Sequence, residues 1–291
     1  MKKLWLLIKT TVTSWSDDYA PSMGAALAFY TLFSIAPLLL IVLSIIGFIF
    51  GEEAARGEIV GQLQNLMGEQ GAMAVQALLQ NVNKPTEGMF ATIVGIVLLL
   101  IGATSVFGEL QNALDRIWRA PERAQTSGLW NLIHMRLLSF GMILGIGFIS
   151  MVSLLLSAGL SAINKWWSPI LNNTDNDWLV LVGSLNALFS FLITTAMFAL
   201  IYKLMPRAKI DWKDVLIGAV ITSILFTVGK SLIGLYIGTS AIASGYGAAG
   251  SLLVLLVWVY YSAQVFLMGA EFTWVYANIY GSRKNQPSSY R

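Results

Sequence analysis

Long apolar runs without a charged residue dominate the pattern of this chain. Four of them cover residues 19–51, 88–108, 137–164 and 178–202, and a fifth, from 215 to 270, is interrupted only by Lys230. About 20 apolar residues in a helix cross the hydrocarbon core of a bilayer, so each run is long enough to span it. The fifth run is long enough for two crossings, and the glycine-rich stretch GTSAIASGYGAAG (238–250) supplies the turn between them.

The pattern therefore predicts an all-α polytopic membrane protein with six transmembrane helices. Their expected ranges are 24–50, 89–109, 137–163, 178–203, 213–237 and 249–277. These helices form a single domain over 24–280, which a tail over 281–291 follows. Within 1–23, apolar residues at helical spacing lie beside lysines, which predicts a helix on the membrane surface; a frayed tail is the alternative.

The longest loop, residues 51–88, follows the first predicted helix. Apolar residues recur there with helical period opposite polar ones, which predicts two short amphipathic helices. They could form a lid or a docking surface for an envelope protein, or they could simply cover exposed helix ends.

Charge fixes the expected orientation. Only 11% of the 291 residues are charged and 56% are apolar, far from the balance of a soluble domain. Lysine and arginine concentrate in segments 1–9, 116–136, 203–213 and 283–291, which share one side of the predicted topology. The positive-inside rule then places both termini in the cytoplasm, and the basic inner face suits anionic lipids better than nucleic acid.

Polar residues recur on one face of four predicted helices. The stripes are Ser150, Ser153, Ser157 and Ser161; Gly183, Asn186, Ser190 and Thr194; Ser223, Thr227, Lys230 and Ser231; and Tyr261, Gln264 and Glu271. If such stripes face one another, the bundle has a polar interior, because polar groups are costly against lipid. Interhelical packing is the alternative for each hydroxyl stripe, but the two ionisable groups, Lys230 and Glu271, favour a wet cavity.

The segment TVGKS (227–231) is similar to the end of a phosphate-binding loop, but Ile224 stands where that motif needs its first glycine. Lys230 is instead expected in the outer part of the bilayer. It could extend to the headgroups, or it could bind an anionic group such as a lipid phosphate inside the bundle.

Two further features concern packing. The segment ELQNALDRIWRAP (109–121) predicts a helix with Leu110, Ala113, Leu114, Ile117 and Trp118 on one face, ending at Pro121. Glycines four residues apart, at 141 and 145 and at 234 and 238, predict close helix approach.

Catalytic chemistry is not expected. The single histidine, His134, lies at a predicted membrane boundary, cysteine is absent, and no cluster of His, Asp and Glu has metal-ligand spacing. We therefore expect no enzyme activity, no metal and no cofactor.

Three segments resemble the bacterial YihY/BrkB family: AALAFYTLFSIAPLLLIVLSIIG (25–47), SVFGELQNALDRIWRAP (105–121) and YGAAGSLLVLLVWVYYSAQVFLMGAEFTWVYA (246–277). The resemblance implies a six-helix inner-membrane protein, in a family linked to serum resistance and virulence and once labelled ribonuclease BN. It also implies signature positions at Glu271 and at Asp115, Arg116 and Trp118, which could alternatively dock a partner.

These observations support two hypotheses of different classes, with the historical ribonuclease label as the weakest third. The first is a transporter or flippase-like protein that moves a lipid or other amphiphile through a polar interior, with Lys230 on the headgroup. The second is a scaffold or partner subunit in the envelope, in which the stripes are packing. The substrate, direction, energy source and oligomeric state do not follow from the sequence.

Overall fold

The computed structural model describes residues 2–50, 57, 61, 64, 69, 72–76, 105–120, 176–239 and 250–284. Every regular element in these ranges is helical. The helices are α1 (Lys2–Asp17), α2 (Ala20–Phe50), α6 (Asn176–Leu204), α7 (Trp212–Thr239) and α9 (Gly250–Ile279). Residues 105–117 form a further helix.

Three described helices are long and apolar enough to cross a membrane: Ala187–Leu204, Trp212–Ile237 and Gly250–Ile279. They confirm the expected all-helical membrane protein and coincide with the predicted helices at 178–203, 213–237 and 249–277. Helix α2 covers the first predicted span but begins at Ala20. The predicted helix 137–163, most of 89–109 and most of the loop 51–88 lie outside the described residues.

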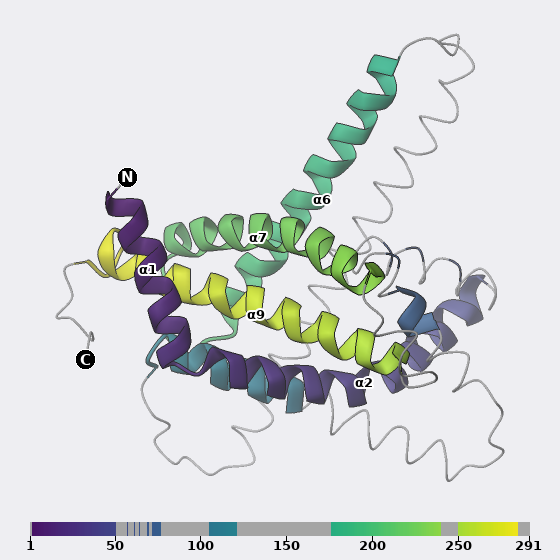
Figure 1. The fold of residues 1–291 in the computed structure, drawn as a ribbon, viewed down its shortest axis with the longest axis horizontal. Coiled ribbons are helices and arrows are strands. Elements are labelled where there is room, and N and C mark those ends of the chain that lie inside the picture. Colours follow the sequence, from purple (N-terminus) through teal and green to yellow (C-terminus); the bar gives the residue numbers. More distant parts are fainter. Residues whose placement is uncertain are drawn as a thin grey trace.

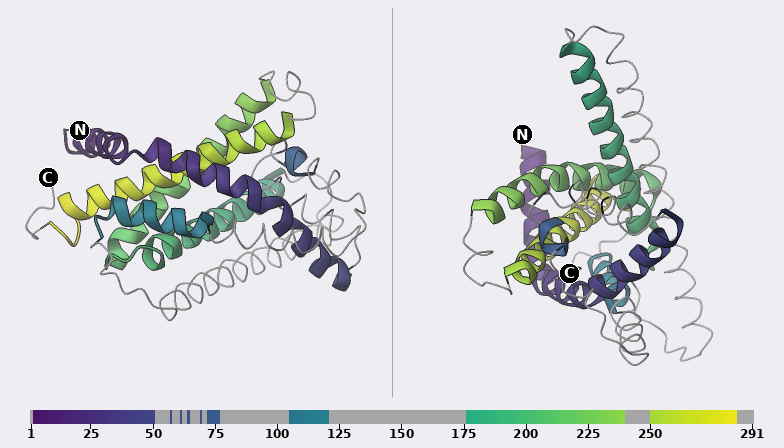
Figure 2. Two further views of the ribbon diagram at one scale, coloured as in Figure 1. Left: turned by 90° about the horizontal axis from the view of Figure 1, so that it is seen from below. Right: turned by 90° about the vertical axis from the view of Figure 1, so that its right-hand side faces the viewer.

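Helix α9 is central to the described bundle. It packs against α7 on one side and α2 on the other, and α1 crosses it near the end of the chain. Helix α6 packs on α7 and then tilts away from the other helices (Figure 1). The left view of Figure 2 shows that α1 and the C-terminal end of α9 lie at the same end of the bundle.

Small residues bring α7 and α9 together. A side chain on Gly269 of α9 would meet the hydroxyls of Thr222 and Tyr202, and one on Gly218 of α7 would meet Thr273. The Tyr202 hydroxyl donates to the carbonyl of Phe266 at 2.7 Å and lies 3.1 Å from the Thr222 hydroxyl. Gly234 has open space around it, so the expected close approach there is wrong.

The helix over 105–117 packs into the main core. Ala113, Leu114, Ile117 and Trp118 are buried, which confirms the predicted apolar face. The helix ends before Pro121, because Arg119 turns the chain with a φ of 48°. A second non-glycine residue with positive φ, Tyr19 at 58°, makes the corner between α1 and α2.

Candidate functional site

Charged residues from distant parts of the chain meet at one end of the bundle, which we call the basic end. It comprises the α1–α2 corner, residues 115–120, the connection 205–211 with the adjoining ends of α6 and α7, and residues 279–284. These segments are the described parts of the side that the charge pattern predicts to be cytoplasmic. Two groups of residues at this end have distinct chemistry.

The first group surrounds Glu271, whose side chain is fully buried in α9. Among the described residues, no N–H or O–H group donates to either of its carboxyl oxygens. Asp18 from the α1–α2 corner lies within hydrogen-bonding reach of the Glu271 carboxyl group. The Arg119 guanidinium lies 4.0 Å from Asp18 Oδ2 and over the ring of Trp274, 4.6 Å from its centroid.

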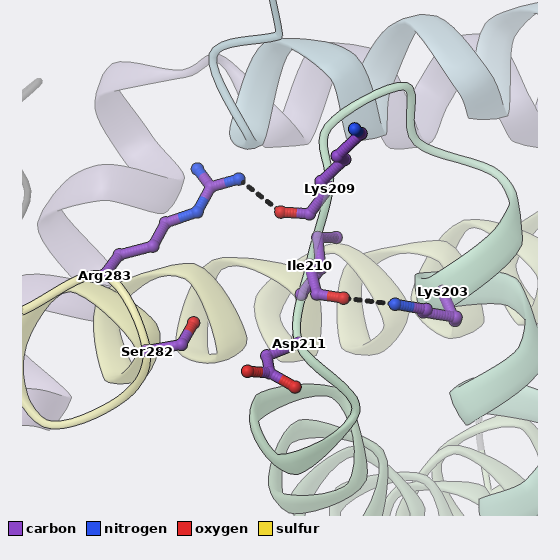
Figure 3. Close-up of a pocket in the computed structure, with 6 residues that line it drawn as sticks. All are labelled: Lys203, Lys209, Ile210, Asp211, Ser282 and Arg283. Carbon is purple, nitrogen blue, oxygen red and sulfur yellow. Dashed lines mark hydrogen bonds between the residues drawn. The ribbon is translucent and has the colours of Figure 1, made fainter.

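The second group lines an open depression of about 380 Å³ at the ends of the spanning helices (Figure 3). The lining residues are Lys203, Lys209, Ile210, Asp211, Ser282 and Arg283. Three cations against one carboxylate give the depression a net positive charge, which favours an anionic ligand.

Backbone carbonyls hold two of the three cations in place. Arg283 donates to the carbonyl of Lys209 at 2.9 Å, and Lys203 donates to the carbonyl of Ile210 (Figure 3). Arg283 also stacks on Trp118, 5.0 Å from the ring centroid. Burial lowers the pKa of Arg283 below its usual value, and the negative charge of Asp214 partly offsets this effect.

Two aspartates, Asp115 and Asp214, join the connection between α6 and α7 and the start of α7 to other parts of the chain. Asp115 accepts from the backbone N–H of Arg207 at 2.8 Å and lies 3.3 Å from its Nε, an ion pair without hydrogen-bond geometry. Asp214 accepts from the backbone N–H of Ser282 at 3.1 Å and from its hydroxyl at 2.6 Å. These contacts fix the depression relative to the end of α9.

The predicted stripe on α7 does not form a single interior face. Ser223 is buried, Lys230 is half-buried, and Thr227 and Ser231 are exposed. The Ser231 hydroxyl lies 3.5 Å from the carbonyl of Thr227. A hydroxyl satisfied within its own helix tolerates exposure, so a polar stripe need not turn inward.

The stripe on α6 behaves in the same way. Ser190 is exposed, and the Thr194 hydroxyl donates to the carbonyl of Ser190 at 2.9 Å. Asn186 lies in α6, but its side chain is outside the described residues, as is the whole predicted stripe from Ser150 to Ser161. The exposed positions on α6 and α7 do not belong to a buried polar face among the described residues, and the polar interior formed by four stripes stays a prediction.

The stripe on α9 lies within the bundle. Tyr261 is half-buried against Gly229 of α7, and half-buried Gln264 lies against Gly24 of α2 and 3.4 Å from the carbonyl of Pro21. Glu271 continues this line to the basic end. Among the predicted path residues that the structure describes, Glu271 lies in a cluster of ionisable groups.

A comparison with protein families adds to this geometry. The sequence profile described as Virulence factor BrkB matches residues 11–291. The chain belongs to this family.

Curated relatives of this BrkB-family chain carry the name UPF0761 membrane protein. One from Pseudomonas aeruginosa (strain LESB58) is 27% identical over 258 residues, 87% of this chain and 58% of the relative. One from Tolumonas auensis is 27% identical over 263 residues, 88% of this chain and 80% of the relative. The chain thus spans little more than half the length of the Pseudomonas relative. No solved structure matches it.

The family's proposed signature segment packs inside the bundle. Trp118 is buried, Asp115 is bonded to Arg207, and the Arg116 guanidinium lies over Tyr19 at 5.1 Å from the ring centroid. Asp115 and Trp118 are engaged within the chain, and partner docking at this segment stays a prediction.

Sequence reasoning missed several residues of the basic end. None of Asp18, Arg119, Trp274, Asp214, Ser282 and Arg283 was predicted as a site residue, and Arg119 and Arg283 counted only toward the orientation. Their contacts join residues far apart in the chain, such as Asp214 and Ser282, 68 positions apart, which no local spacing indicates. In the described part of the chain, no three His, Cys, Asp or Glu residues are grouped to hold a metal.

Proposed function

We propose that this membrane protein binds the headgroup of an anionic amphiphile at the basic end and moves the molecule across the bilayer. The proposal places it in a bacterial inner membrane, with the basic end on the cytoplasmic side and a non-catalytic role. The observation that carries the proposal is the depression lined by Lys203, Lys209 and Arg283.

The level of this depression supports a headgroup ligand. Lys203 lies one residue before the end of α6, and Trp212, which begins α7, is 47% exposed beneath the Lys203 ammonium group. Tryptophan at the end of a spanning helix is typical of the interface between lipid and water. Basic groups at that level attract anionic lipid headgroups.

Movement across the bilayer is supported by a second cation on α7. Lys230 lies 18 residues after Trp212, which at 1.5 Å per residue is roughly 27 Å along the helix. That separation approaches the thickness of the hydrocarbon core, about 30 Å. The depression beside the start of α7 and Lys230 farther along the helix would thus offer cationic contacts near the two membrane surfaces.

The test is movement of fluorescent phospholipids in liposomes reconstituted with the full chain. Lys209→Gln is the informative change, because the Lys209 side chain has no ion pair among the described residues. We expect slower movement of anionic phospholipid in Lys209→Gln and in Lys230→Ala, and an unchanged rate in Lys213→Gln, an exposed lysine outside the depression.

Two outcomes would contradict the proposal. If no anionic or zwitterionic lipid moves faster than in empty liposomes, the transport step is wrong. If anionic lipid also fails to bind, the headgroup site is wrong as well. Binding without movement would favour the alternative function, a membrane scaffold that holds anionic lipid.

A further inference from the structure

The buried carboxyl group of Glu271 points to a function that is independent of lipid binding. It lies in a spanning helix with no solvent exposure, and no described donor reaches either oxygen. Most buried polar groups have a partner, so an exception needs an explanation such as a proton, an ion or a functional role. An ionisable group within the membrane is by default a functional candidate.

Asp18 is the acidic neighbour of Glu271. Its carboxyl group lies within hydrogen-bonding reach of Glu271, and its Oδ2 is also buried without a described donor. Two carboxylates have no hydrogen to place between them, so this contact becomes a hydrogen bond only when one of them is protonated. Carboxyl groups this close share one proton, because like charges at that distance cannot both persist in a buried site.

The charges around the pair are unbalanced. The described ionisable groups that act on Glu271 are Asp17 at the end of α1, Asp18 in the α1–α2 corner and Arg119 from the segment after residue 117. Arg119 faces Asp18 at 4.0 Å and is stacked on Trp274. One cation faces three carboxyl groups, so binding a proton would reduce the net negative charge of this cluster.

Two residues with positive φ help to position Asp18 and Arg119 beside Glu271. Tyr19, which follows Asp18, and Arg119 both have positive φ, at 58° and 48°. Bulky side chains rarely adopt this conformation, and strained residues that persist cluster at functional sites. Asp18 and Arg119 therefore approach Glu271 from two corners that the fold holds in place.

We infer that Glu271 and Asp18 form a proton-binding pair that couples the α1–α2 corner to α9. In the protonated state the shared hydrogen joins the two carboxyl groups. The proton leaves to water through Asp18, whose side chain is 16% exposed, and leaves two carboxylates behind. Arg119 is placed to compensate Asp18, while repulsion from Glu271 pushes the corner away from α9.

The first test uses infrared spectroscopy on the full chain in nanodiscs at neutral pH. The readout is the C=O stretch of protonated carboxylic acids. Glu271→Gln and Asp18→Asn should each lose the signal of one group relative to wild type, because the new amide donates to the remaining carboxylate. Glu109→Gln, the same change at a partly exposed acid, should lose none.

The inference is overturned if the signal survives in both variants. It is also overturned if wild type has no such signal but its carboxylate bands shift when sodium replaces a large organic cation. That result would indicate a bound monovalent metal ion in place of the proton.

A second measurement does not depend on Asp18→Asn folding. The chain contains no cysteine, so spin labels can be placed uniquely through Ser16→Cys and Tyr280→Cys, both at exposed positions. Raising the pH should lengthen and broaden the distance between the labels, and Glu271→Gln should abolish this response. A pH response that Glu271→Gln leaves unchanged would contradict the coupling. Since neither readout involves lipid, the outcome is separate from that of the proposed lipid transport.

Discussion

The basic end and the outer surface of α6 and α7 treat polar residues in opposite ways. At the basic end, polar groups bind across elements: Asp214 binds Ser282, and Asp115 binds Arg207. On the outer surface, hydroxyls donate to their own helix, as Thr194 does to Ser190 and Thr239 does to Leu235. The first kind of contact fixes tertiary structure, whereas the second is neutral toward it.

The difference lies in the chemistry of the side chains. A hydroxyl carries a hydrogen and can always use the carbonyl of the preceding turn. An ionised carboxylate has no hydrogen and must find a donor, a proton or a cation elsewhere. In a spanning helix, therefore, a serine or threonine stripe is weak evidence of a polar path, and a single buried glutamate is strong evidence of a site.

The largest expected contrast concerns two glycines. In Gly269→Ala the new methyl group would lie 2.8 Å from the Thr222 Cβ, so we expect a loss of about 1 to 3 kcal/mol in the free energy of unfolding. In Gly234→Ala it meets open space, and we expect no loss or a gain of up to about 1 kcal/mol from helix propensity. Unfolding in detergent mixtures measures the free energy of both variants. A loss in both would contradict the expected difference between the two glycines.

A smaller contrast concerns two aspartates near the start of α7. Asp214→Asn removes a charged acceptor that is 2% exposed and bonded to Ser282, so we expect a loss of about 1 to 2 kcal/mol in unfolding free energy. Exposed Asp211→Asn should change it by less than about 0.5 kcal/mol. Equal losses, measured in the same unfolding assay, would show that the contact with Ser282 contributes nothing specific.

The smallest contrast compares one substitution at two threonines. Thr222→Val removes a buried hydroxyl that donates to Gly218 in its own helix and also lies 3.1 Å from the Tyr202 hydroxyl, and we expect a loss of about 1 kcal/mol. Thr194→Val removes a hydroxyl bonded within its own helix, so stability should stay within about 0.5 kcal/mol of wild type. A larger loss at Thr194 would restore the idea that the α6 stripe contacts a polar interior.

The sequence predicted the helices well and the site poorly. Helices α6, α7 and α9 follow from apolar length, and the buried face of residues 113–118 follows from helical period, because both are local properties. The pairing of Asp18 with Glu271 depends on the corner at Tyr19 and on how α1 crosses α9. Neither has a local signal, since tyrosine gives no indication of a positive φ.

The most direct test of the account is the affinity of the full chain in detergent for a short-chain anionic phospholipid, compared between Lys209→Gln and Lys230→Gln. One basic group near a headgroup contributes about 1 kcal/mol, so Lys209→Gln should weaken binding about fivefold and Lys230→Gln should weaken it less. Inorganic phosphate, measured alongside, distinguishes a lipid site from a general phosphate site. Unchanged binding in Lys209→Gln together with a loss in Lys230→Gln would contradict a headgroup site at the basic end.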